Sequence, residues 1–299
     1  MWFIFALLGY FFLAFVGLTD KFIINKSVPK PAVFTFYSCA LVFVLVFLIP
    51  FGIIWPIGFF DWLMVFLCGG FFVLGLWTMY IGMKNSEVSH YGPLVGASTA
   101  FFVILLSCLF LQEDLTVKQW WAVALLIFGS LLISFEKSKD HDGLHRGMLW
   151  GILCSFLFAA SHIAAKYIYN IYDFYSGFVW TRAAMGVFGF LFLLSPSVRQ
   201  SIFGHRIKTA IPVFKQFFLV SINKFLAIAG IILTQYAIAL GSVSIVNALA
   251  GVQYALLVIV VALISKFIPR WFEEKYANGE MAQELASVII IGIGLSLLI

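Results

Sequence analysis

Charged residues are scarce in this chain. Asp, Glu, Lys and Arg make up 10% of the 299 residues, whereas apolar types make up 63%. A soluble domain carries roughly 25% charged and about 45–50% apolar residues. A chain with so few charges cannot cover its apolar surface in water, so lipid must be the solvent for much of it.

The sequence also lacks the residue patterns of common catalytic, metal and nucleic-acid sites. It has no Gly-x-Ser-x-Gly, no His-Glu-x-x-His, no phosphate-binding loop, and no basic stripe interleaved with aromatic residues. The four cysteines lie in apolar runs without CxxC spacing, so we interpret Cys39, Cys68, Cys108 and Cys154 as small core residues. We therefore expect no enzyme activity, catalytic residue, metal site, cofactor or nucleic-acid partner, and no ATP-driven mechanism in this chain alone.

Ten apolar runs are long enough to cross a bilayer as helices, which takes about 20 residues each. Lipid forbids unpaired backbone groups, so such dense apolar runs must be helical. We expect an all-α integral membrane protein with ten transmembrane helices, at 2–22, 32–50, 62–83, 93–112, 119–135, 147–167, 174–194, 216–240, 243–264 and 284–299.

Self-comparison pairs the two halves of the chain in three blocks. The first pair is separated by about 145 residues, and both of its members end in Lys-x-Ile-x-Asn. The second pair is separated by about 155 residues. The blocks are 6–25 with 151–170, 88–103 with 243–258, and 128–132 with 293–297.

The repeat predicts two units of five helices, at 1–140 and 147–299. An odd number of crossings per unit makes the second unit enter the membrane from the opposite side. We therefore expect inverted repeats, an architecture in which a substrate site lies near the midplane between the two units.

The segment between the third and fifth predicted helices resembles the ten-helix EamA type of the drug/metabolite transporter superfamily. The resemblance lies in the helix end at 80–84, which begins with Tyr80, in Val88-Ser89 and Pro93-Leu94, in the acidic segment 110–116, in Gln119 and in Gly129. The sequence departs from the family pattern where Gln112 replaces a Gly, where Ala248 stands opposite Pro93 in the second half, and in the long segment 269–284.

The resemblance implies transport of a small metabolite across the cytoplasmic (inner) membrane, often export of amino acids. It also implies a central cavity lined by the first, third, fourth, sixth, eighth and ninth helices. From this we expect a secondary transporter that works by alternating access, with the solute and the lipid bilayer as partners. The alternative is a membrane-embedded enzyme or a lipid-handling protein, which would require an acidic or His cluster at one membrane face.

Polar side chains inside the apolar runs are the candidate substrate-binding residues, because a charge at membrane depth is costly unless it faces a cavity or a partner. Lys224 is either a cavity-facing cation or a surface residue of a helix that starts later. His162 is either a proton-coupling group or a packing His held by hydrogen bonds, and Arg182 is either a ligand or the structural Arg that the resemblance implies. The full candidate set is Lys224, Asn223, His162, Trp77, Tyr80, Gln235, Tyr236, Asn247, Gln253 and Arg182, with Tyr254 beside them.

The first run carries no acidic residue before Asp20 at its end, whereas related small multidrug exporters depend on a mid-membrane Glu there. Buried cations in place of that acid favour a neutral, zwitterionic or anionic solute over a cationic drug. Lys21 and Lys166 are equivalent residues at run ends, and we expect both to extend to the membrane interface.

Orientation is left open by two opposed arguments. Most Lys and Arg residues lie in alternate loops, beginning with the first, which places those loops in the cytoplasm and both termini outside. The family resemblance implies both termini inside. The sequence fixes neither the coupling ion nor the oligomeric state.

Overall fold

The computed structural model describes residues 1–26, 30–84, 86, 88–134, 146–203, 213–267 and 280–298. All regular secondary structure in these residues is helical. Eight of the helices are long and apolar enough to cross a bilayer, and two shorter apolar helices cover Val243–Leu257 and Ala282–Ser296. The chain is therefore an all-helical, multi-pass integral membrane protein.

The helices follow the apolar runs closely. Those of the first half are α1 (Trp2–Lys26), α2 (Pro31–Val42) with its 3₁₀ extension η1 (Phe43–Leu48), α3 (Phe59–Lys84), α4 (Val88–Leu106) with the π-helical turn η2 (Ser107–Leu111), and α5 (Val117–Ser134). Those of the second half are α6 (Arg146–Ile171), α7 (Phe174–Leu191) with η3 (Phe192–Leu194), α8 (Pro196–Phe203), α9 (Val213–Leu240), α10 (Val243–Ala248), α11 (Ala250–Phe267) and α12 (Glu280–Ser296).

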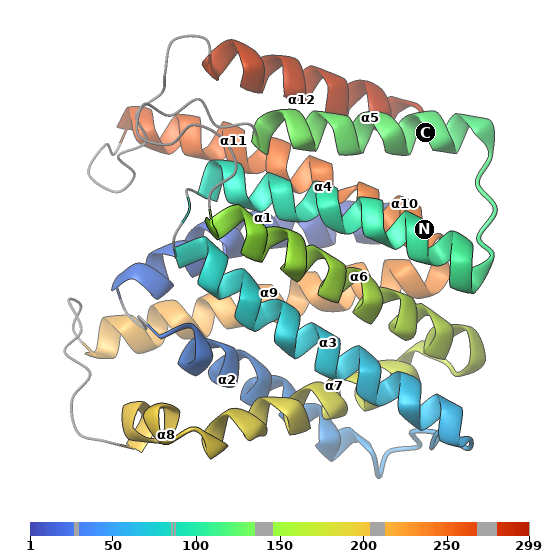
Figure 1. Ribbon diagram of the computed structural model, residues 1–299, viewed down its shortest axis with the longest axis vertical. Helices are drawn as coiled ribbons and strands as arrows, with labels where there is room; N and C mark the ends of the chain where they lie inside the picture. The colour runs from blue at the N-terminus through green and yellow to red at the C-terminus, as the bar shows by residue number, and fades with distance from the viewer. Residues whose placement is uncertain are drawn as a thin grey trace.

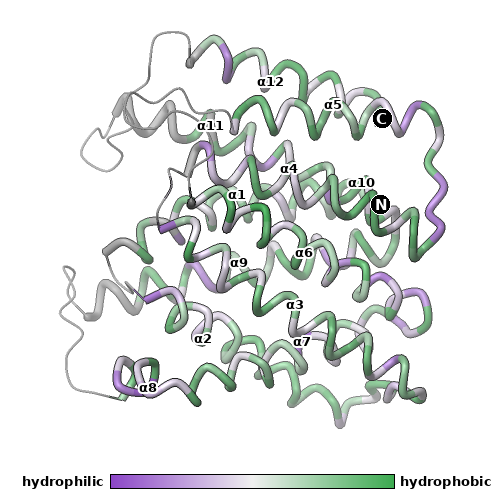
Figure 2. Tube along the Cα trace, in the orientation of Figure 1, coloured by the Kyte–Doolittle hydropathy of each residue, from purple (hydrophilic) through white to green (hydrophobic). Residues whose placement is uncertain are grey.

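Figure 2 shows apolar residues along most of these helices, with hydrophilic ones gathered at α8 and at the connection between α4 and α5. The short helix α8 lies between the predicted apolar runs at 174–194 and 216–240. The predicted boundary between the two units, near residue 140, lies outside the described residues.

Helices of the two halves interdigitate, as Figure 1 shows. The first helix of each half packs along the third helix of the other, in the pairs α1–α9 and α6–α3. The second helices pack together as α2–α7, and the fifth as α5–α12. The interior of the bundle is therefore built jointly by both halves.

Glycines occupy equivalent places where α5 meets α12. A Cβ atom on Gly129 would lie 2.7 Å from the Cγ1 atom of Ile291, and one on Gly294 would lie 3.1 Å from the Cγ atom of Leu126. Each helix thus presents a glycine to an aliphatic side chain of the other. Both glycines permit an approach that any larger residue would prevent.

The π-helical turn at the end of α4 stops at Gln112. This residue has a φ of 49°, in the left-handed region, and its N–H donates to the carbonyl of Ser107. Glycine adopts this conformation at little cost, whereas other residues are strained in it. The position where the sequence departs from the family's Gly is therefore one whose backbone favours Gly.

Side chains from other helices hold the turn between α9 and α10. Lys166 on α6 donates to the carbonyls of Ile238 at 2.9 Å, Ala239 at 3.3 Å and Gly241 at 2.9 Å, at the carboxyl end of α9. The half-buried Lys166 ammonium thus satisfies free carbonyls at a helix end, and its extension to the interface stays a prediction. The side chain of its counterpart, Lys21, lies outside the described residues.

The amino end of α10 meets a carboxylate. Glu113, in the connection between α4 and α5, accepts hydrogen bonds from the backbone N–H and the hydroxyl of Ser244. The Ser244 hydroxyl also lies 2.7 Å from that of Ser107. An anion at a helix amino end and a cation at a helix carboxyl end both match the helix dipole, so this turn is fixed from two sides.

The connection between η1 and α3, residues 49–58, is pinned to the second half. Ile54 donates its backbone N–H to the Ser176 hydroxyl at 2.9 Å, and Trp180 donates its Nε1–H to the carbonyl of Ile54 at 2.8 Å. Ile57 donates its backbone N–H to the Tyr172 hydroxyl at 2.9 Å. Side chains thus take the place of backbone partners for this stretch of irregular chain.

Candidate functional site

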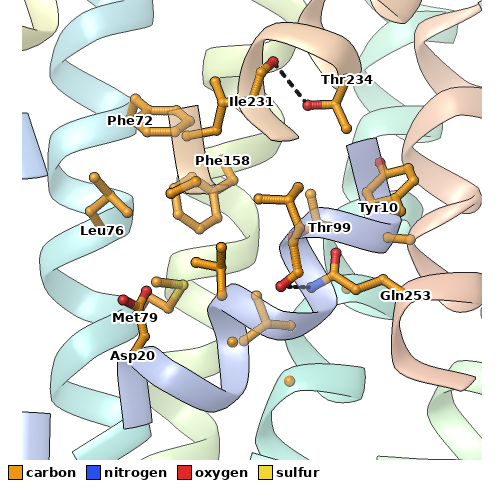
Figure 3. A pocket seen from close by; sticks show the side chains of 18 of the residues that line it. Tyr10, Asp20, Phe72, Leu76, Met79, Thr99, Phe158, Ile231, Thr234 and Gln253 are labelled. Atoms are coloured by element: carbon orange, nitrogen blue, oxygen red, sulfur yellow. Dashed lines mark hydrogen bonds between the residues drawn. The ribbon is translucent and has the colours of Figure 1, made fainter. Parts of the chain in front are cut away.

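A cavity of about 250 Å³ lies in the interior of the bundle. Figure 3 shows Phe72, Leu76 and Met79 following one another along α3, with Thr99 and Gln253 across from them. Lining residues come from all six helices that the family resemblance implied, and also from α2 and α7. Both halves of the chain therefore form one internal site.

Two opposite charges meet at the wall of this cavity. Asp20 of α1 is 5% exposed and Lys224 of α9 is 6% exposed, and the Lys224 Nζ lies 3.6 Å from the Asp20 Oδ1. The ammonium also lies 4.0 Å from the centre of the Phe34 ring. Lys224 is therefore a buried, cavity-lining cation and not a surface residue of a later-starting helix.

Three neighbours satisfy the Asp20 carboxylate and the groups around it. The Asn223 Nδ2 donates to Asp20 Oδ1 at 2.6 Å, and the Tyr80 hydroxyl donates to Asp20 Oδ2 at 3.5 Å. The Ser38 hydroxyl lies 3.3 Å from that of Tyr80. Asn223 itself does not line the cavity, so its role here is to hold the carboxylate.

A second polar group, from α6 and α9, includes His162 and Gln235. The Gln235 Nε2 lies 3.2 Å from the His162 Nδ1, and the Tyr169 hydroxyl donates to the Gln235 Oε1 at 3.0 Å. His162 and Gln235 line the cavity, and Tyr169 does not. His162 is thus held by a hydrogen bond, as expected of a packing residue. It also lines the cavity, as a proton-coupling group would have to.

Asn247, Gln253 and Tyr254 also line the cavity. Two of them use their amides on the backbone, Asn247 Nδ2 on the Val243 carbonyl at 2.9 Å and Gln253 Nε2 on the Leu13 carbonyl at 3.4 Å. Among the described residues, the hydroxyls of the lining residues Tyr91 and Thr99 have no hydrogen-bond partner. Both hydroxyl oxygens are buried, so the two residues line the cavity with other parts of their side chains.

Besides Asn223, three predicted site residues lie away from the cavity lining. Trp77 is 36% exposed and packs its ring against Phe192. Tyr236 packs between Phe5 and Phe174. Arg182 is 2% exposed and lies behind the cavity wall.

Asp20 is the site residue that sequence reasoning missed. It was placed at the end of a helix, but α1 continues for six residues beyond it to Lys26, so the carboxylate lies inside the protein. Lys224 could have indicated this partner, because an ammonium at membrane depth has a high free-energy cost unless a carboxylate pairs with it. Asp20 is the acidic residue of α1, which made it the natural partner to test.

The four cysteines of the chain are free, and three of them are buried. Cys39, Cys68 and Cys154 are buried as expected, but Cys108 is exposed on the π-helical turn. The part of the chain that the structure describes contains no group of three His, Cys, Asp or Glu residues placed to hold a metal ion.

Family comparison matches residues 1–135 to the EamA-like transporter family. Those residues are similar to that family. The match ends just after α5, so the EamA-like part contains the five helices of the first half, including Asp20 and Tyr80. The match to this family indicates a membrane transporter, and the resemblance inferred from the motifs is confirmed.

Similarity to a solved structure extends beyond the EamA-like part. A chain described as "Crystal structure of protein" superposes with a TM-score of 0.64 at 14% sequence identity, covering 99% of this chain and 95% of that one. Similarity at this level of identity shows the fold alone, and it includes the second half. No curated protein matched the chain.

Proposed function

We propose that this protein is a secondary transporter that moves a small metabolite across the cytoplasmic membrane by alternating access. The observation that carries the proposal is the pairing of Asp20 from the first half with Lys224 from the second half at an internal cavity. Charges at membrane depth are costly, and they occur where a protein binds polar cargo or ions. Export of an amino acid or a similar solute is the direction that the family resemblance favours.

Ten spans in two inverted halves are part of this proposal. The eight long helices would be joined by α10–α11, which are separated only by Leu249, and by α12. Equivalent contacts at the α1–α9 and α3–α6 pairs support the inversion. A Cβ atom on Gly230 would lie 2.9 Å from Leu13, and one on Gly75 would lie 2.7 Å from Phe158, and these are corresponding positions in the repeat.

The cavity favours a small cargo. Its volume of about 250 Å³ falls below the range of about 300–1,000 Å³ typical of pockets for drug-sized ligands. The chemistry of its polar groups suits a neutral, zwitterionic or anionic solute. In the described chain Asp20, Lys224 and His162 are the acidic, basic and imidazole groups that line it, so a coupling proton would bind at one of them.

The alternative, a membrane-embedded enzyme or lipid-handling protein, would need an acidic or His cluster at a membrane face. The buried pair Asp20 and Lys224 instead lies at an internal cavity, which favours transport.

Reconstitution into proteoliposomes tests the proposal. Counterflow of labelled amino acids and small organic acids should identify at least one transported compound. Lys224→Met and Asp20→Asn should lower its transport by about tenfold or more, since each removes a charged contact worth above about 1.4 kcal/mol. Lys118→Met, on an exposed residue at the start of α5, is the matched control and should transport as the wild type does. A panel with no transported member, or full activity in both cavity variants, would refute the proposal.

A further inference from the structure

Arg182 is the most deeply buried charged side chain in the described part of the protein, at 2% exposure. Its guanidinium lies over two aromatic rings, 4.7 Å from the centre of Phe72 and 5.2 Å from that of Phe178. The Nη1 atom contacts the sulfur of Met185 at 3.7 Å, and the Nε atom has no hydrogen-bond partner. The Tyr169 hydroxyl also interacts with the guanidinium. The described neighbours of this group with five donors are therefore two rings, a thioether and a phenol, all of them uncharged.

The charges around the cavity do not balance. Asp20 and Lys224 neutralise each other, and no carboxylate of the described residues forms an ion pair with Arg182. The two ring contacts offset only part of the cost of burying an unpaired charge. One negative charge is therefore missing from this part of the bundle.

The guanidinium lies one side chain away from the cavity. Phe72 and Met185, which it touches, both line the cavity. A change of rotamer at Phe72 or Met185 would bring Arg182 into contact with a solute. Phe72 lies eight residues before Tyr80 on α3, so this point is about 12 Å along the helix from the Asp20–Lys224 pair.

The backbone that carries Arg182 is held close to α3. A Cβ atom on Gly69 would lie 2.5 Å from the backbone nitrogen of Met185 and 2.7 Å from the carbonyl carbon of Ala184. The two helices are therefore in close backbone contact one turn from Arg182. This contact fixes the backbone that carries Arg182. Access of a solute to the guanidinium would therefore require a change in the side chains of Phe72 and Met185.

We propose that Arg182 is the anchor for the carboxylate of the transported solute. This inference rests on the proposed transport function and narrows its substrate class to small organic monoanions with an apolar body. The carboxylate supplies the missing charge and accepts two parallel hydrogen bonds from the guanidinium. The body lies against the apolar side chains of Leu76 and Phe158 that line the cavity.

The unliganded protein provides a test that needs no substrate. Arg182→Met removes the unpaired charge and retains an unbranched apolar side chain, so the melting temperature of the purified, ligand-free variant should rise above that of the wild type. A structural arginine would give the reverse. A lower melting temperature for Arg182→Met than for the wild type would therefore overturn the proposal.

Ligand binding provides the second test, measured by thermal shift and calorimetry in detergent. Phenylacetate, phenylpyruvate and benzoate are the anionic probes, and 2-phenylethanol and benzyl alcohol are their uncharged counterparts. The carboxylates should stabilise the wild type and the alcohols should not. Arg182→Met should bind the carboxylates about tenfold or more weakly, and Arg182→Lys should fall between the two because an ammonium cannot form the paired contact.

The outcomes separate the two claims. Equal effects of alcohols and carboxylates, no effect of any carboxylate on the wild type, or unchanged carboxylate binding in Arg182→Met would each refute the anchor. Transport by wild type that Arg182→Met leaves unchanged would refute the anchor and retain the transport function. Carboxylate binding that depends on Arg182, without transport in proteoliposomes, would retain the anchor and refute the transport function.

Discussion

Asp20 and Lys224 stabilise the protein only as a pair, because each charge compensates the burial of the other. Burying two charges costs several kcal/mol each, and their mutual attraction with added hydrogen bonds roughly offsets that cost. Asn223 and Tyr80 supply such bonds here. Removing one member leaves the other charged and unpaired inside the bundle, which is the expensive situation.

A double-mutant cycle on this pair should show strong coupling. Lys224→Met and Asp20→Asn should each destabilise the protein by about 3–5 kcal/mol, whereas the double variant should lie closer to the wild type than either single one. Thermal or denaturant unfolding in detergent measures all four proteins under one condition. Additive losses would mean that the two side chains do not interact.

Gln112 should be a site of stabilisation by substitution. Its left-handed backbone costs a non-glycine residue about 1–2 kcal/mol, so Gln112→Gly should raise the unfolding free energy by an amount up to that size. Gln119→Gly, in the first turn of α5, is the opposing control and should lower it by about 1 kcal/mol or more, because it also removes the acceptor of the Thr116 N–H. Loss of stability in Gln112→Gly would show that the side chain contributes more than the strain costs.

Residue orientation was the part of the site that the sequence could not predict. Gln235 lines the cavity while its neighbour Tyr236 packs against Phe5 and Phe174, and Tyr80 faces inward while Trp77 is exposed. In a soluble helix the polar face reveals which side is outside. Lipid is as apolar as the protein interior, so the pattern carries no such signal.

At the scale of elements, Lys166 acts on the end of a helix. Lys166→Met removes the donor for three carbonyls at the end of α9 and should cost about 1.5–3 kcal/mol, as expected for hydrogen bonds to a charged group. Unfolding of Lys166→Met and of the exposed control Lys118→Met would be compared. Equal stability of the two variants would contradict the capping role.

The positions of the helices were well predicted, because long apolar runs have few alternatives in lipid. The run at 174–194 coincides with α7 and η3, and the run at 62–83 falls within α3. What hydropathy did not reveal were local events within or between runs. The π-helical turn at Ser107–Leu111 and the break at Leu249 leave the apolar run uninterrupted, and the short helix α8 is too polar to register.

At the scale of the whole molecule, the α5–α12 contact joins the two halves through equivalent glycines. Gly129→Ala and Gly294→Ala should each cost about 1–3 kcal/mol through overpacking. Gly292→Ala, on the same helix with open space around its added methyl, should be neutral or stabilising by up to about 1 kcal/mol. Unfolding in detergent tests the set, and a cost at only one of the first two sites would contradict their equivalence.

The repeat in the sequence predicts a site between the two halves, but it does not predict how their helices pack. The aligned blocks predicted which helices correspond, as with Gly129 and Gly294. They did not predict that the first helix of each half packs along the third helix of the other. That arrangement depends on which helix faces are buried between the halves. Hydropathy does not show those faces in a membrane protein, because lipid is as apolar as the protein interior.

The pinned connection at 49–58 should be recognisable by the rate at which its amide hydrogens exchange with solvent. Ile54 and Ile57 donate their backbone N–H groups to side chains of the second half, and bonded amides exchange only when the structure opens locally. Deuterium uptake should therefore be slow at these two amides, although they belong to no helix. Ser176→Ala should speed exchange at Ile54 and leave Ile57 slow, whereas fast exchange at both in the wild type would mean that this stretch opens independently of the bundle.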